Sequence, residues 1–128
     1  MPPGATRTPS LPPLDCAAEA QRISRWMVEA LASRLQRRGL VVALSGGVDS
    51  SVCAALAVRA VGAGKVYGLL LPERDSSAVG TERARRLACQ LGIAHEIFDI
   101  GPALAALGCY ERRDAAVRRV FPSYGAGW

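Results

Sequence analysis

The feature that most constrains this chain is a Gly-Gly pair set between an apolar run and a second apolar pattern of helical spacing. The stretch covers residues 41–51 and reads VVALSGGVDSS. An apolar run followed by turn residues predicts a buried strand, and the residues after the turn predict a helix. A strand, a tight glycine turn and a helix gather backbone N–H groups at the positive end of the helix dipole. Such a nest binds an anion, most often phosphate.

Length and composition limit the class of protein. The chain has 128 residues, half of them hydrophobic, which suffices for one domain with a core. No apolar stretch reaches the length that crosses a bilayer, and the first residues lack the continuous apolar segment of a secretory signal. We therefore expect a globular cytoplasmic protein with no membrane partner.

Cysteine and histidine usage argues against most metal sites. The four cysteines never form a Cys-x-x-Cys pair, and there is one histidine, His95. These numbers predict neither a zinc knuckle nor a thioredoxin motif nor a histidine-rich metal site. The cysteines stand at Cys16, Cys53, Cys89 and Cys109.

The net charge of +5 raises the question of a nucleic-acid partner. Almost all of the excess is arginine, which is spread over several segments and interleaved with acidic residues such as Glu29, Glu82 and Glu111. This pattern is typical of solvated helix faces rather than of a continuous basic stripe. We expect no nucleic-acid partner.

The chain divides into a tail and one domain. Residues 1–14 contain five prolines and little apolar surface, which predicts a disordered tail. Residues 15–128 are expected to form the domain. Its first helix begins after Asp15, a suitable N-cap, and is predicted to stop at Gly39.

The rest of the domain alternates strands with helices. Strands are predicted over residues 40–44, 66–71 and 94–100, the third near a sheet edge, and the helices between them stop at Gly62 and Gly92. Two helices are predicted near the end, over 104–107 and 110–120. Repeated strand-helix-strand units predict the α/β class: a doubly wound, Rossmann-like parallel sheet with helices on both faces.

The residues of the glycine turn narrow its chemistry. A Walker loop needs a lysine and a dinucleotide fingerprint needs Gly-x-Gly-x-x-Gly, and both are absent here. Gly46 and Gly47 let the backbone approach phosphate, and the neighbouring hydroxyls (Ser45, Ser50 and Ser51) can donate to it. Asp49 repels a bare phosphate, so its presence predicts a bridging divalent cation, with Mg²⁺ as the candidate.

This turn resembles the pyrophosphate-binding loop (PP-loop) of the N-type ATP pyrophosphatases, whose SGGxDS motif it matches at every fixed position. The wider context resembles the NAD synthetase family: LSGGVDSSVCAALAVRAVG, then VYGLLLPERDSS, then a helix ending LGI and a strand ending FDI. The resemblance implies an ATP site with Asp49 on magnesium, with Ala43 and Leu70 flanking the adenine and with Arg74 and Ser76 in a nearby loop. The implied ATP-binding residues are Ala43, Leu44, Ser45, Gly46, Gly47, Val48, Asp49, Ser50 and Leu70.

The resemblance also implies a reaction. In that family ATP adenylates the nicotinate carboxylate of deamido-NAD, and ammonia then displaces AMP to give NAD, with pyrophosphate as the other product. It assigns no catalytic residue here. An amidotransferase has no room in this chain, so we expect free ammonia or a glutaminase partner.

The family's catalytic domain continues well beyond the residues present here, so we expect a truncated or split sheet with an unpaired first strand. A homodimer or another partner is expected to cover that strand, and the chain alone is expected to show little activity. Two alternatives stay open. The chain could be a catalytically inactive nucleotide-binding or interaction module, or another PP-loop ATP pyrophosphatase such as a sulfur-transfer enzyme.

Overall fold

The structure, a computed structural model, describes residues 13–125. The disordered tail predicted over residues 1–14 therefore lies almost wholly outside the described residues. No helix among residues 13–125 combines the length and the apolar character needed to span a membrane. The elements in chain order are α1 (Cys16–Glu29), the π-helical turn η1 (Ala30–Leu35), β1 (Leu40–Ala43), α2 (Val48–Val61), the 3₁₀ turn η2 (Ala63–Lys65), β2 (Val66–Leu70), α3 (Ala78–Leu91), β3 (Ala94–Ile97), α4 (Gly101–Ala106) and α5 (Cys109–Val120).

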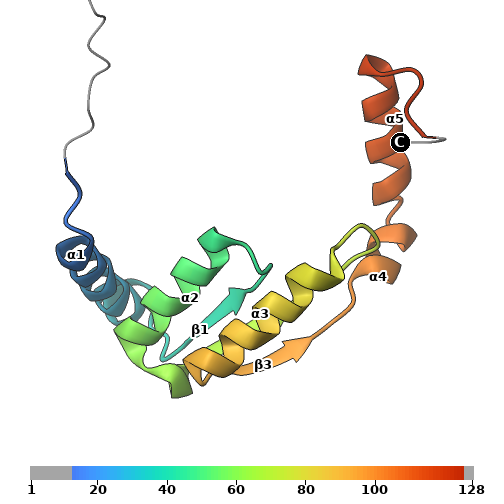
Figure 1. The fold of residues 1–128 in the computed structure, drawn as a ribbon. Coiled ribbons are helices and arrows are strands. Elements are labelled where there is room, and N and C mark those ends of the chain that lie inside the picture. Colours follow the sequence, from blue (N-terminus) through green and yellow to red (C-terminus); the bar gives the residue numbers. More distant parts are fainter. Residues whose placement is uncertain (1–12, 126–128) are drawn as a thin grey trace, which may run out of the picture.

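The three strands form one parallel sheet in the order β1-β2-β3 (Figure 1). Leu40 pairs with Val66, and Tyr67 pairs in turn with Ala94. The predicted α/β class with an open parallel sheet is thereby confirmed. The carboxyl ends of β1 and β2 lie side by side, which is where ligands bind in sheets of this kind.

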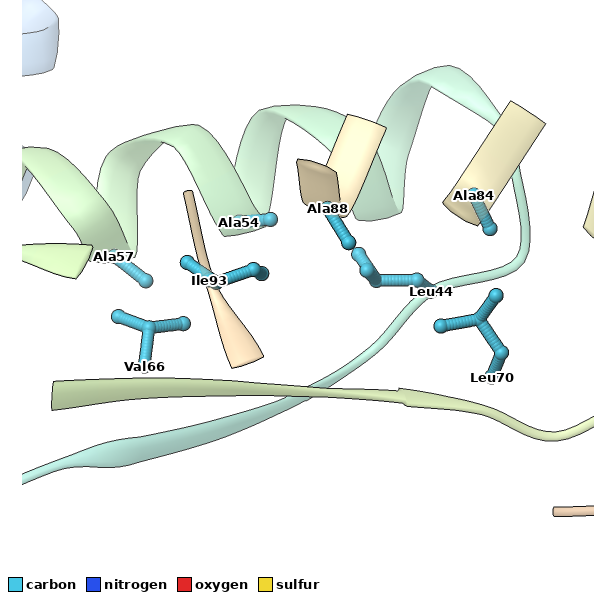
Figure 2. Close-up of a cluster of buried hydrophobic side chains, with 8 residues drawn as sticks. All are labelled: Leu44, Ala54, Ala57, Val66, Leu70, Ala84, Ala88 and Ile93. Atoms are coloured by element: carbon cyan, nitrogen blue, oxygen red, sulfur yellow. The ribbon is translucent and has the colours of Figure 1, made fainter. Parts of the chain in front are cut away.

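Both crossover helices cover the same face of the sheet. The sheet advances in one direction from β1 to β3, and right-handed crossovers in one direction place their helices on one side. α2 contacts β1 and β2, α3 contacts β2 and β3, and α1 packs on α2. The core lies between these helices and the sheet, as Figure 2 shows, and its buried members are Leu44, Ala54, Ala57, Val66, Leu70, Ala84, Ala88 and Ile93.

The opposite face of the sheet is uncovered within residues 13–125, so the expected helices on both faces are not found in this part of the chain. Val41 is 65% exposed and Tyr67 39% exposed, and both point away from the α2–α3 side. The outer edge of β1 has no strand partner among the described residues. Helices reach the second face of a doubly wound sheet only when the strand order reverses beside the first strand.

The first helix begins as predicted but ends differently. Asp15 caps it, because its carboxylate accepts hydrogen bonds from the backbone N–H groups of Ala17 and Ala18, each at 3.0 Å. The prediction of a stop at Gly39 was wrong: the helical stretch ends at Leu35, and Gln36 takes the left-handed conformation with φ +50°. Gly39 serves a different need, since a Cβ there would lie 2.7 Å from the Lys65 carbonyl oxygen.

The third strand is shorter than predicted. It ends at Ile97 instead of residue 100, although Phe98 N–H still donates to the Leu70 carbonyl at 2.8 Å and Ile100 N–H to that of Pro72 at 3.0 Å. After Ile100 the chain leaves the sheet and enters α4 at Gly101. The predicted stops at Gly62 and Gly92 are confirmed, and both glycines have positive φ angles.

We expect Asp15→Ala to lower the free energy of unfolding by about 1 kcal/mol, because two N–H groups of α1 lose their acceptor. Urea denaturation measures this change. Ser77→Ala is the matched control, since Ser77 is the N-cap of α3 but makes no side-chain capping hydrogen bond. Equal effects of the two substitutions would contradict the capping role.

Candidate nucleotide-binding site

The turn between β1 and α2 is held in place by a backbone contact with α3. Gly46 has a φ of +80°, and a Cβ on it would lie 2.2 Å from the carbonyl oxygen of Gly80. A Cβ on Gly80 would in turn lie 3.1 Å from the carbonyl oxygen of Ser45. Two glycines therefore allow the turn and the first turn of α3 to touch through their backbones.

The serine hydroxyls of the turn mostly bond within the turn itself. Ser51 Oγ donates to the Gly47 carbonyl at 2.7 Å, and Ser50 Oγ lies 3.2 Å from the same oxygen. Ser51 N–H donates to it as well, at 3.2 Å. The Gly47 carbonyl and the Val48 N–H belong to one trans peptide, so they point in opposite directions. Because the carbonyl points toward the helix, the Val48 N–H points toward the open side of the turn.

Ser45 completes this local network. Its Oγ lies 3.1 Å from Ser50 Oγ and accepts from the N–H of Gly47 at 3.3 Å. The three hydroxyls that the sequence offered as phosphate donors are thus brought together, with Ser51 turned toward the helix. Ser45 is exposed and lines the neighbouring pocket, so its hydroxyl can rotate from its present hydrogen bond to a phosphate oxygen.

The helices α2 and α3 both begin beside this turn, and neither N-terminus has a side-chain cap. The N-cap residues Gly47 of α2 and Ser77 of α3 make no side-chain capping hydrogen bond, in contrast to Asp15 of α1. The first N–H groups of a helix have no partner within the helix. Two sets of such donors, each at the positive end of a helix dipole, form a site for an anion.

A pocket of about 150 Å³ lies between the start of α3 and the carboxyl ends of β1 and β2. This volume is below the range of roughly 300 to 1,000 Å³ that ligand pockets occupy. The described residues therefore enclose too little space for a whole nucleotide. The pocket is lined by Leu44, Ser45, Leu70, Leu71, Pro72, Ser76, Ser77, Gly80 and Thr81.

The structure separates some of the residues that the sequence grouped. Leu70 is 1% exposed and belongs to the core face, whereas Ala43 is exposed and, paired with Leu69, belongs to the opposite face. Their side chains therefore lie on different sides of the sheet. Ser76 lines the pocket, but Arg74 does not, because its guanidinium lies over the ring of Tyr110.

Asp49 stands in the first turn of α2 and is exposed. Its carboxylate makes no hydrogen bond or ion pair with any residue that the structure describes. Residues 13–125 contain no group of three or more His, Cys, Asp and Glu side chains placed to hold a metal. A single free carboxylate beside an anion nest fits Mg²⁺ that arrives with a nucleotide, since this ion keeps most of its ligands from phosphate and water.

Sequence reasoning missed two residues of α3, Gly80 and Thr81, which both line the pocket. The signal for them was Gly80 itself. A glycine within a helical pattern costs stability, so its presence indicates a packing or functional reason. Only the fold shows that this reason is the turn of residues 45–47, more than thirty residues earlier in the chain.

Fold and site together define an α/β domain with a glycine turn, suited to an anion, between its first strand and the following helix. The family model for NAD synthase matches residues 19–119. The chain belongs to the NAD synthase family. The NH(3)-dependent NAD(+) synthetase of Rhizobium rhizogenes is 50% identical over 115 residues, covering 90% of this chain and 35% of the relative.

Solved structures agree with this assignment. The NH3-dependent NAD synthetase from Campylobacter jejuni, in complex with a nitrate ion, aligns with a TM-score of 0.67 and 31% identity over 73% of this chain and 40% of that chain. The NMN synthetase from Francisella tularensis aligns with a TM-score of 0.70 and 28% identity over 79% and 41%. The chain spans about a third of the length of the curated relatives it matches.

Proposed function

We propose that this chain carries the ATP-binding part of an ATP-dependent NAD synthetase. The observation that carries the proposal is the pair of uncapped helix N-termini, of α2 and α3, on either side of the Gly46 turn. A pyrophosphate group is the portion of ATP that such a nest suits best, because it offers several oxygens to several N–H groups. The match of the family model over residues 19–119 supports the same assignment.

The proposed reaction consumes ATP, deamido-NAD and ammonia. The nicotinate carboxylate attacks the α-phosphorus of ATP, the bond to the β-phosphate oxygen breaks, and pyrophosphate leaves. Ammonia then attacks the acyl carbon, the acyl–oxygen bond breaks, and AMP leaves with the bonding electron pair. The products are NAD, AMP and pyrophosphate, with one proton lost from the nitrogen. The relatives are named as NH3-dependent, which supports free ammonia as the nitrogen source.

Each part of the site has a task in this reaction. The N–H groups of Val48 and Asp49 bind the leaving pyrophosphate, and Ser45 and Ser50 donate hydroxyls to it. Residues at the ends of β1 and β2, including the backbone at Ala43 and Leu70, lie beside the adenine. Asp49 would hold Mg²⁺, which would supply positive charge to the phosphates when bound.

The uncovered edge of β1 needs a partner in the working enzyme. The backbone N–H and C=O groups on the outer edge of β1 have no strand partner among the described residues, and Val41 is exposed on the face of the same strand. Such an edge is prone to unwanted pairing unless it is covered. We propose that either a second copy of the chain or the portion of the relatives that these residues do not match covers it. The enzyme would work in the cytoplasm.

The test measures ATP binding and adenylation separately. Calorimetric titration with ATP and Mg²⁺ is expected to show binding to the chain, with inorganic pyrophosphate as a competitor. Labelled pyrophosphate that enters ATP only in the presence of deamido-NAD would show the adenylation step as well. Nicotinate mononucleotide is the control substrate, because one structural neighbour is an NMN synthetase.

The outcomes separate the alternatives. ATP binding without exchange would favour a nucleotide-binding module that is not catalytic. Exchange that needs a different acid would favour another ATP pyrophosphatase. A chain that binds neither ATP nor pyrophosphate would overturn the proposal.

A further inference from the structure

The loop after β2, residues 72–77, is tied to the first turn of α5. Tyr110 of α5 is 7% exposed, and its hydroxyl donates to Glu73 Oε2 at 2.9 Å. The Tyr110 hydroxyl oxygen in turn accepts from the backbone N–H of Arg74 at 3.3 Å. The Arg74 guanidinium lies 3.9 Å from the centre of the tyrosine ring. Figure 1 shows this loop, coloured yellow-green, reaching the beginning of α4 and α5.

Glu73 links Tyr110 to the backbone of loop 72–77. Its Oε1 accepts from the backbone N–H of Asp75 at 3.0 Å, so one carboxylate joins Tyr110 to the loop backbone. Its own backbone N–H donates to Ser76 Oγ at 3.0 Å. Ser76 is one of the residues that line the pocket beside the Gly46 turn. A continuous series of hydrogen bonds therefore runs from α5 to the pocket wall.

A second tie lies on the outside of the loop. Arg113 of α5 forms an ion pair with Asp75 and another with Asp114. The hydrogen bonds from Arg113 and then Arg74 hold the pKa of Asp75 below its ordinary value. This pair is exposed, so its contribution is small, whereas Tyr110 is buried enough for its contacts to matter.

We propose that Tyr110 is a positioning residue for the nucleotide pocket, because it fixes loop 72–77 through Glu73 and thereby places Ser76 and Ser77. The part of this inference that concerns ATP rests on the proposed function. No contact between Tyr110 and the substrate is needed. Anchoring the loop before ATP arrives removes the cost of ordering it on binding.

The test uses Tyr110→Phe, which keeps the ring and its stacking on Arg74 but removes the hydroxyl. The first readout is hydrogen exchange of single backbone amides, followed by NMR. We expect the Asp75 amide, which does not touch Tyr110, to exchange about 10-fold faster, because Glu73 is released. The second readout is the Kd for MgATP, which we expect to be about 10-fold weaker.

Two controls make these readouts specific. Tyr67→Phe removes another tyrosine hydroxyl that donates to a glutamate, Glu96, at 3.4 Å, but on the uncovered face of the sheet. It is expected to change neither readout. Glu73→Ala breaks the same connection without altering α5 and is expected to reproduce the Asp75 result.

Each outcome decides the question. Faster exchange of Asp75 with normal exchange of Gly62, whose N–H donates to Val58 in α2, supports a local positioning role. Unchanged Asp75 exchange in Tyr110→Phe overturns the inference even where Glu73→Ala speeds that exchange, and so does faster exchange confined to α5. If the unmodified chain binds no ATP, the proposed function fails, but the amide measurement still tests how Tyr110 holds the loop.

Discussion

Gly46→Ala is expected to lower the free energy of unfolding by about 2–5 kcal/mol and to remove detectable ATP binding. Alanine at φ +80° is strained, and its Cβ would lie 2.2 Å from the Gly80 carbonyl oxygen. That oxygen belongs to the backbone of α3, so it cannot move away as a flexible side chain would. The turn or α3 must shift, and either shift separates the two helix N-termini.

Urea denaturation and calorimetric titration with ATP measure the two effects of Gly46→Ala. Gly64→Ala is the matched control, because Gly64 has no positive φ and a Cβ there meets nothing within 4 Å. The control is expected to change stability by about 0.5 kcal/mol or less. A Gly46→Ala protein as stable as the control would show that the contact with Gly80 does not constrain the turn.

The local elements of this fold could be predicted from the sequence because their signals are local. Asp15 as a cap, Gly62 and Gly92 as stops, and the strand-turn-helix around Gly46 follow from residue type and spacing. The helix end near Gln36 could not be predicted in this way. A non-glycine residue takes the left-handed conformation there, while Gly39 is required by the later Lys65 carbonyl.

Only part of the site could be predicted, because the sequence signals are local and the pocket joins distant segments of the chain. The SGGxDS residues predict a phosphate-binding loop from sequence alone, but the pocket is also lined by Gly80 and Thr81 from α3. Their role depends on which strands become neighbours, and that depends on the direction in which the sheet advances. The uncovered face of the sheet has the same origin, since both crossovers run one way.

Asp49→Asn is expected to weaken the effect of magnesium on phosphate binding. Asp49 is exposed, without a partner among the described residues, and it stands in the first turn of α2 beside the nest. Its charge repels a bare pyrophosphate and attracts one that carries Mg²⁺. We expect the variant to bind metal-free pyrophosphate more tightly and to lose on the order of 10-fold or more of the gain that Mg²⁺ gives with ATP.

Calorimetric titrations of pyrophosphate and ATP, each with and without Mg²⁺, give the four affinities needed to test Asp49→Asn. Glu111→Gln is the matched control, because Glu111 is also an acidic residue in the first turn of a helix without a side-chain cap. Both substitutions remove one favourable charge from a helix N-terminus, which is worth about 0.3–1 kcal/mol, so their effects on stability should be similar. Only Asp49→Asn should change the magnesium dependence; if that dependence is the same as in the unmodified chain, Asp49 does not meet the metal.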